Sequence, residues 1–140
     1  MSAARLLARR QRRQLDDALA EAAVLKRRLA QLDHDEAAEA VEADRQFAQA
    51  DAHGLRQMPA YLAAVRARKA GRARDRAALH QALEALQPRI LLHHREAEKF
   101  ETVEAARQDQ TRLDRKRREQ GVIGDLAMIG FITRRRASAS

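Results

Sequence analysis

The sequence predicts an all-α protein: a long antiparallel two-helix coiled-coil hairpin with a kink near Pro88 and a short apolar C-terminal segment. Three observations support this prediction: the composition, the spacing of the apolar residues and the distribution of charge. Of the 140 residues, 31 are Ala, 34% are charged and only 3% are aromatic. This composition is typical of long helices and does not supply a thick globular core.

The first arm of the hairpin is predicted from apolar residues that recur every three or four positions. These residues are Leu15, Ala18, Ala22, Leu25, Leu29 and Leu32. Such a heptad pattern favours a helix that packs against another helix. Beyond Leu32 this spacing meets Glu36 and Glu39, and we expect smaller apolar residues to continue the contact face instead: Ala37, Ala40, Val41, Ala43 and Phe47.

The second arm repeats the same spacing, sparsely at first and then strongly. Its apolar positions are Leu62, Val65, Leu79, Leu83, Leu86, Ile90, Ala97 and Phe100. Pro88 lies between strong positions on both sides. Because proline removes a backbone N–H and its ring crowds the preceding turn, we expect a kink within this arm.

Gly54 and Pro59 mark the break between the two arms. Glycine takes the left-handed conformation that ends many helices, and proline suits the first turn of the next helix. We therefore expect one domain over residues 1–120, with arm one at about 4–53, a turn at about 54–58 and arm two at about 59–120. Residues 121–140 form an apolar and then basic tail.

Charge distinguishes a hairpin from a single long rod. Residues 15–52 carry ten acidic and four basic side chains, whereas residues 53–100 carry four acidic and ten basic ones. If the chain reverses, position i lies opposite position 113 minus i, which brings acidic residues 33–44 beside basic residues 66–76. The alternative, a long parallel dimer, would place the acidic stretch against its own copy.

The tail holds a dense apolar run: Val122, Ile123, Leu126, Met128, Ile129, Phe131 and Ile132. It is too short to cross a bilayer. Three interpretations remain open: a short helix that folds back toward Leu6 and Leu7, an end that docks into a partner protein, and an end that contacts a membrane.

Nothing in the sequence predicts an enzyme, a small-molecule substrate or a cofactor, and we assign no catalytic residues. There is no Cys, and Ser occurs only at Ser2, Ser138 and Ser140. His34 and His80 would face each other across the hairpin, but two histidines are a weak metal site, so we predict no metal. Basic residues at 5–14 and 112–120 would attract phosphate, yet no aromatic residues lie among them, and nucleic acid is not the expected partner.

A family resemblance rests on residues of the second arm. These are Glu98-Lys99-Phe100-Glu101, the Arg- and Gln-rich run that ends at Arg118-Glu119-Gln120, Asp125, and Tyr61 with Leu62. With the length, the hairpin and the basic ends, the chain resembles the FliJ and YscO family of type III export proteins. It departs from the family at Gly124-Asp125, which an apolar run follows, and in the many Arg and Ala residues of arm one, so flagellar or virulence membership stays open.

The resemblance implies a cytoplasmic central-stalk-like protein at the cytoplasmic face of the inner membrane, associated with the membrane through the export complex. The open end would enter the export ATPase ring and promote its assembly or activity. The rest would contact the export gate or chaperones. At the ATPase end we expect Arg5, Arg9, Arg10, Arg12, Arg13, Arg115, Arg117 and Arg118 to bind acidic loops. At the hairpin tip we expect apolar anchors at Phe47, Leu55, Met58, Tyr61 and Leu62, unless these residues only close the coiled coil. The alternative function is a generic coiled-coil adaptor or scaffold.

Overall fold

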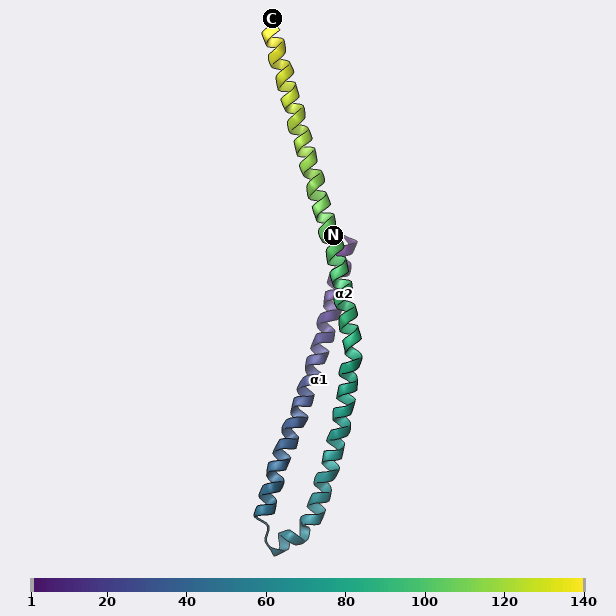
Figure 1. Cartoon of the computed structure of the whole chain (residues 1–140), viewed down its shortest axis with the longest axis vertical. Helices are drawn as coiled ribbons and strands as arrows, with labels where there is room; N and C mark the ends of the chain where they lie inside the picture. The colour runs from purple at the N-terminus through teal and green to yellow at the C-terminus, as the bar shows by residue number, and fades with distance from the viewer. Residues whose placement is uncertain (1, 140) are drawn as a thin grey trace. The chain divides into compact units, whose positions relative to one another are not determined.

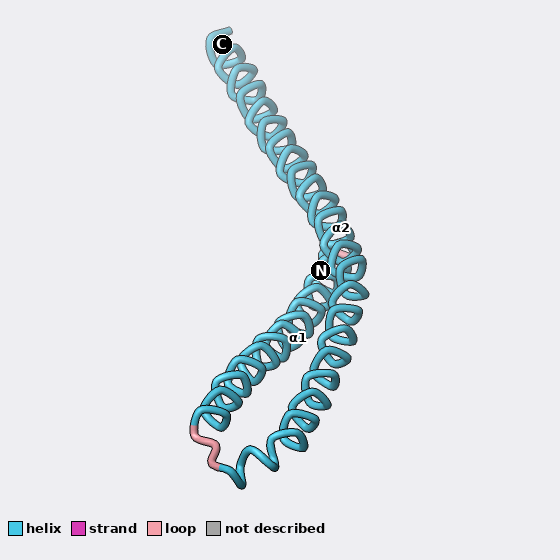
Figure 2. Tube along the Cα trace, turned by 60° about the horizontal axis from the view of Figure 1, so that its bottom comes forward, coloured by secondary structure: helices cyan, strands magenta, loops and turns pink. Residues whose placement is uncertain are grey.

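A computed structural model describes residues 2–139, which form two helices and no strand: α1 (Ala3–Ala48) and α2 (Ala52–Ala139) (Figures 1 and 2). The predicted all-α class is therefore confirmed. The chain divides into two compact units. The hairpin unit comprises Gln11–Arg95, and the terminal unit comprises Met1–Arg10 together with Glu96–Ser140. Each helix contributes to both units.

Ser2 starts α1 and also ties it to α2 within the terminal unit. The Ser2 hydroxyl accepts a hydrogen bond from the Arg5 backbone N–H at 3.1 Å, which satisfies one of the donors left free at a helix start. The same hydroxyl donates to the Glu104 carboxylate. This contact lowers the pKa of Glu104, and the charges of Arg107 and Arg5 act in the same direction.

The connection between the helices comes earlier than predicted, because Asp51 begins α2. Its carboxylate accepts a hydrogen bond from the Gly54 N–H at 2.8 Å, and its carbonyl accepts one from the Leu55 N–H at 2.9 Å. Asp51 is thus the N-cap of α2. Gly54 lies inside the first turn, and none of the glycines has a positive φ. The predicted turn at about 54–58 and the expected left-handed Gly54 were therefore wrong, whereas the predicted start of arm one at about residue 4 agrees with the start of α1.

Both prolines lie inside α2. We had expected Pro59 in the first turn of its helix, and this expectation was wrong. The cap at Asp51 sets the start of α2 at Ala52, seven residues before Pro59. In Figure 1 the first turns of α2 run across the end of the hairpin before the helix turns back beside α1. A proline in a helix interior withholds one backbone hydrogen bond, which allows such a change of direction.

Within the hairpin unit, the contacts between α1 and α2 are those of a hairpin. Arg76 contacts Glu36, Arg89 contacts Glu21 and His93 contacts Gln11, so the partner's number rises as the number on α1 falls. The prediction placed position 36 opposite 77 and position 11 opposite 102. The observed partner of position 36 is therefore within one residue of the prediction, whereas the partner of position 11 lies nine residues earlier than predicted.

The hydrophobic core of the hairpin unit lies toward its open end. Ala18, Ala22, Leu25 and Leu86 are buried together, and the partly buried Leu79, Ala82, Leu83 and Ile90 pack against them. Both helices thus contribute Ala and Leu side chains to this cluster. The predicted pairing of Ala22 with the region of Ile90 agrees with this cluster, whereas Leu91 is 47% exposed and lies outside it.

The three- and four-residue spacing of inward-facing side chains continues through the acidic stretch. On α1 the spacing passes from Leu32 through the sheltered Glu36, Glu39 and Ala43, and on α2 Arg72 and Arg76 occupy the corresponding positions before Leu79. We call these rows of inward positions the seam. Val41 is 69% and Phe47 63% exposed, so the expected shift of the seam onto Ala37, Ala40, Val41 and Phe47 was wrong. Paired charges make that shift unnecessary.

In the terminal unit, α2 continues without a break to Ala139. From Ala105 onward every described residue is exposed except Asp114 and Gly130, which are partly exposed. The interpretation that residues 121–140 fold back as a separate short helix is therefore wrong: the chain extends one helix and its apolar side chains stay accessible. Within residues 2–139 no helix is both long and apolar enough to cross a membrane.

Candidate partner-binding surfaces

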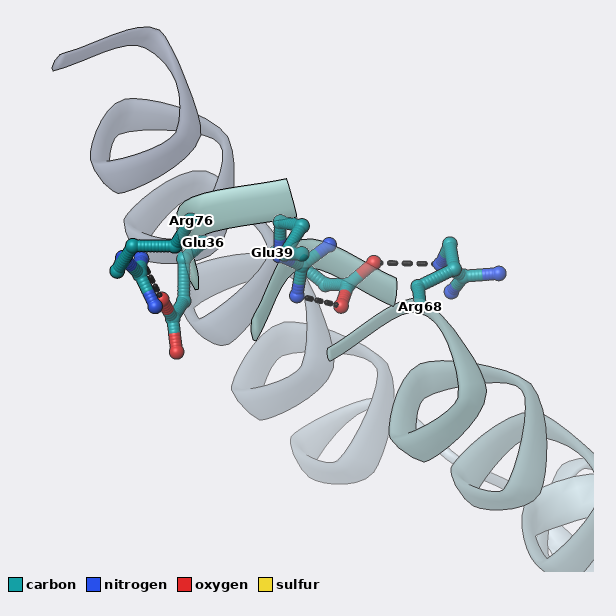
Figure 3. A network of polar contacts seen from close by, with 5 residues as sticks. Glu36, Glu39, Arg68 and Arg76 are labelled. Carbon is teal, nitrogen blue, oxygen red and sulfur yellow. Dashed lines mark hydrogen bonds and ion pairs between the residues drawn. The ribbon is translucent and has the colours of Figure 1, made fainter. Parts of the chain in front are cut away.

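Ion pairs join residues of the acidic stretch 33–44 on α1 to residues of the basic stretch 66–76 on α2. Glu39 accepts hydrogen bonds from Arg72 and from Arg68, each at 2.6 Å (Figure 3). Arg76 donates to Glu36 at 2.7 Å and to Asp33 at 3.0 Å. We call these six residues the ionic layers: Asp33, Glu36, Glu39, Arg68, Arg72 and Arg76.

The ion pairs of the ionic layers favour the ionised form of each partner. The hydrogen bond from Arg76 lowers the pKa of Glu36, and the bonds from Arg72 and Arg68 lower the pKa of Glu39. In return, the carboxylates raise the pKa values of Arg72 and Arg76. All four groups therefore remain ionised at neutral pH. The seam positions of these residues were visible in the sequence, because the heptad spacing that passes through Leu32 reaches Glu36 and Glu39.

The most sheltered pair of this group is Arg72 with Glu39, whose side chains are 14% and 15% exposed. Arg68 is 51% exposed, and Asp33 is 72% exposed. The Nε atom of Arg72 is buried and has no hydrogen-bond acceptor. A buried donor without an acceptor destabilises the closed arrangement. Ion pairs therefore stabilise this part of the hairpin, and the unpaired Nε of Arg72 destabilises it.

The arginines predicted to bind an ATPase fall into separate groups. Arg5, Arg9 and Arg10 lie in the terminal unit, and Arg12 and Arg13 lie in the hairpin unit. Arg5 lines a hollow of about 280 Å³ with Ser2, Glu104 and Arg107, not with Arg115. The start of α1 contacts α2 at Glu104, through Ser2. Arg115, Arg117 and Arg118 lie farther along α2 than this contact.

The C-terminal part of α2 combines exposed apolar and basic side chains. Its apolar side chains are 43–65% exposed: Val122, Ile123, Leu126, Met128, Ile129, Phe131 and Ile132. Seven positions span every side of a helix at 100° per residue, so this run has no polar face. Arg115 and Arg118 line a shallow hollow together with Val122 and Ile123. Arg134, Arg135 and Arg136 follow the run. We call residues 112–139 the end segment.

The residues predicted at the hairpin tip divide into two kinds. Phe47, Leu55 and Leu62 are 63%, 52% and 37% exposed and form accessible apolar contacts. Met58 is buried, at 8% exposure, and closes the hairpin near the connection. Met58 and Tyr61 line a hollow of about 240 Å³ whose wall is mostly polar: Gln46, Gln49, Asp51 and Gln57 with Ala50 and Gly54.

The histidines are dispersed. His34 and His80 are exposed, while the Nδ1 of His93 lies 2.8 Å from the amide oxygen of Gln11 at a sheltered position of the seam. Within residues 2–139 no group of three or more His, Asp or Glu residues is arranged to hold a metal ion. His93 therefore acts as a polar contact between the two arms.

The chain was compared with known protein families, with curated proteins and with solved structures, and it matches none of them.

Proposed function

We propose that this chain is a central-stalk-like component of a type III protein export apparatus, with the two arms wound as an antiparallel coiled coil. In this proposal the end segment enters the export ATPase ring and promotes its assembly or activity. The connection end of the hairpin unit, at Phe47, Leu55 and Leu62, contacts the export gate or a chaperone. The protein then acts in the cytoplasm, at the cytoplasmic face of the inner membrane.

The coiled-coil part of the proposal is supported by the seam. Sheltered residues recur at alternating steps of three and four from Leu15 to Ala43 on α1 and from Arg72 to Glu104 on α2, which is the spacing of knobs-into-holes packing. Pro88 is an exposed residue of α2 between the seam positions Leu86 and Ile90. It offers no N–H to the carbonyl of Glu84, so we propose a bend of α2 at this point. A bend would let one arm curve around the other.

The observation that carries the functional proposal is the end segment. An isolated helix with apolar side chains on all sides is unfavourable in water, because a monomeric surface rarely leaves so much contiguous apolar area open. Arginine precedes and follows this run. A partner that surrounds the helix with an apolar wall and offers acidic groups beside it would cover both kinds of side chain. The central opening of a ring-shaped ATPase is such a partner, and the resemblance to the FliJ and YscO family supplies its identity.

The test is to add the purified chain to the secretion ATPase of the same cell and to measure ATP hydrolysis and ring assembly. We expect the unaltered chain to increase both. The double variant Ile123→Asp and Ile129→Asp places two charges in the end segment, and we expect it to lose most of this stimulation.

The matched control is Val41→Asp, which places the same charge at an exposed apolar position of the hairpin unit. It should stimulate the ATPase like the unaltered chain. Circular dichroism of all variants shows whether they remain helical. If the unaltered chain neither binds the ATPase nor changes hydrolysis or assembly, the stalk proposal is wrong.

The second candidate is a generic coiled-coil adaptor or scaffold. Accessible apolar residues in both units favour it: Phe47 and Leu55 in the hairpin unit, and the end segment in the terminal unit. An adaptor would bind two other proteins through these two sets. Capture of proteins other than a secretion ATPase, each lost with substitutions in one set only, would favour the adaptor.

A further inference from the structure

The seam of the hairpin unit changes its chemistry along its length. From Leu15 to Leu32 on α1, and from Leu79 to Ile90 on α2, the sheltered residues are apolar and include the core cluster. Toward the connection, Glu36, Glu39, Arg72 and Arg76 replace them. Among the described residues between 26 and 85, the only buried hydrophobic side chain is Met58. The half of the hairpin unit near the connection is therefore held mainly by ion pairs.

These ion pairs are connected through two shared residues. Glu39 binds both Arg68 and Arg72, and Arg76 binds both Asp33 and Glu36. When the helices separate at one shared residue, two contacts are lost together. The exposed members of each set, Arg68 and Asp33, let salt and water reach the layer from its edge. Charged groups in contact with solvent respond strongly to ionic strength.

The core cluster responds differently. Ala18 and Leu86 are 0% and 2% exposed, and burial of apolar side chains does not depend on charge screening. Added salt therefore acts on the two halves of the hairpin unit unequally. It weakens the pairs at Glu39 and Arg76 and leaves the contacts around Leu86 in place.

We propose that the ionic layers are an electrostatic latch, which lets the part of the hairpin unit near the connection open while the apolar core cluster keeps the other part closed. Opening breaks the contacts of Glu39 and Arg76 and frees the unpaired Nε of Arg72 to reach water. It releases three carboxylates on α1 and three guanidinium groups on α2 from one another, so that a charged segment of a partner can replace either side. This device does not depend on the secretion assignment.

The experiment measures distances with two pairs of spin labels, because the chain has no native Cys. Ala37→Cys with Ala73→Cys spans the ionic layers, and Ala23→Cys with Gln87→Cys spans the core cluster; all four positions are exposed. We compare low salt with about 1 M NaCl, at which the Debye length falls to about 3 Å. The first pair should gain a population at longer distance, and the second pair should not change.

Two further variants test the cause. Replacing Glu36, Glu39, Arg72 and Arg76 by Leu gives an apolar seam, and the first pair of labels should then stay at short distance at all salt concentrations. Replacing Glu42 and Arg45 by Leu removes an exposed ion pair within α1 and should leave the salt response of the first pair unchanged.

Hydrogen exchange of the unaltered chain provides a measurement that needs no variant. Added salt should speed exchange in residues 33–44 and 66–76 more than in residues 15–25 and 83–90. The proposal is overturned if the first label pair stays short in about 1 M NaCl, if both pairs lengthen together, or if the apolar-seam variant opens as the unaltered chain does. An equal effect of salt on the exchange rates of the two sets of residues would also overturn it.

Discussion

Individual residues of the same type have different roles in this chain because position on the helix surface decides burial. Leu86 is 2% exposed and belongs to the core cluster, whereas Leu92 on the same helix is 54% exposed. Six residues separate them, which at 100° per residue places them on different faces of α2. The seam spacing, and not hydrophobicity alone, identifies the residues that stabilise the hairpin.

The Leu86→Ala variant should therefore be destabilised by about 2–5 kcal/mol, the range for removing a buried leucine side chain. Leu92→Ala is the matched control and should change the free energy of unfolding by no more than about 0.5 kcal/mol. Urea unfolding followed by circular dichroism measures both. Equal losses for the two variants would contradict the assignment of Leu86 to the core.

At the level of the helices, α1 and α2 are joined by apolar packing in one part of the hairpin unit and by ion pairs in the other. The pKa values of Glu36 and Glu39 are lowered in the folded protein by their arginine partners. A lowered folded-state pKa contributes stability above the pKa of the unfolded chain. That contribution is lost as the pH falls through the lower, folded-state values.

We therefore expect the urea midpoint of the unaltered chain to fall as the pH drops below about 4.3, the ordinary pKa of Glu. The variant Glu36→Gln with Glu39→Gln should be less stable at neutral pH and should lose less on acidification. Glu84→Gln, on an exposed part of α2, controls for the loss of a negative charge. Parallel pH profiles for the double variant and the unaltered chain would refute this role of the two carboxylates.

The end of α2 is a helix supported by few contacts. Gly121, Gly124 and Gly130 lie within it, and a Cβ built on Gly124 meets nothing within 4 Å. Glycine in a helix interior is less favourable than alanine by about 1 kcal/mol, because it has more conformational freedom to lose. Gly124→Ala should therefore slow hydrogen exchange in residues 112–139 without changing exchange in residues 15–25. Faster exchange in the variant would indicate that Gly124 is needed for a conformation other than this helix.

At the level of the whole molecule, the reversal of the chain is the property on which the other conclusions depend. Leu32 and Leu79 line one hollow in the hairpin unit. With cysteine at both positions, a short bifunctional thiol reagent should link them within one chain and give a product of monomer mass. Leu32→Cys with Leu92→Cys is the control, because position 92 lies about 20 Å farther along α2. A product of dimer mass for the first pair would favour two chains side by side.

Much of this arrangement could be predicted from the sequence. The Leu and Ala spacing identified the core residues Ala18, Ala22, Leu25 and Leu86, and the opposite charges of the two stretches identified the partners at 33–44 and 66–76. The connection was predicted less well, because Gly54 and Pro59 are familiar markers of helix ends. Asp51 decided the boundary through a hydrogen bond to the N–H of Gly54, and an Asp among many polar residues gives little signal of its own.

The sequence by itself determined the helical class, the spacing of the contact face and the complementary charges, since each depends on residue type and on the local period of a helix. Only the tertiary structure decided that Glu36 and Glu39 remain in the seam and that Val41 and Phe47 face outward. The physical reason is that a charged residue can occupy an inward position when a partner from a distant part of the chain donates hydrogen bonds to it. Arg72 and Arg76 are those partners, and their positions depend on where the chain turns back.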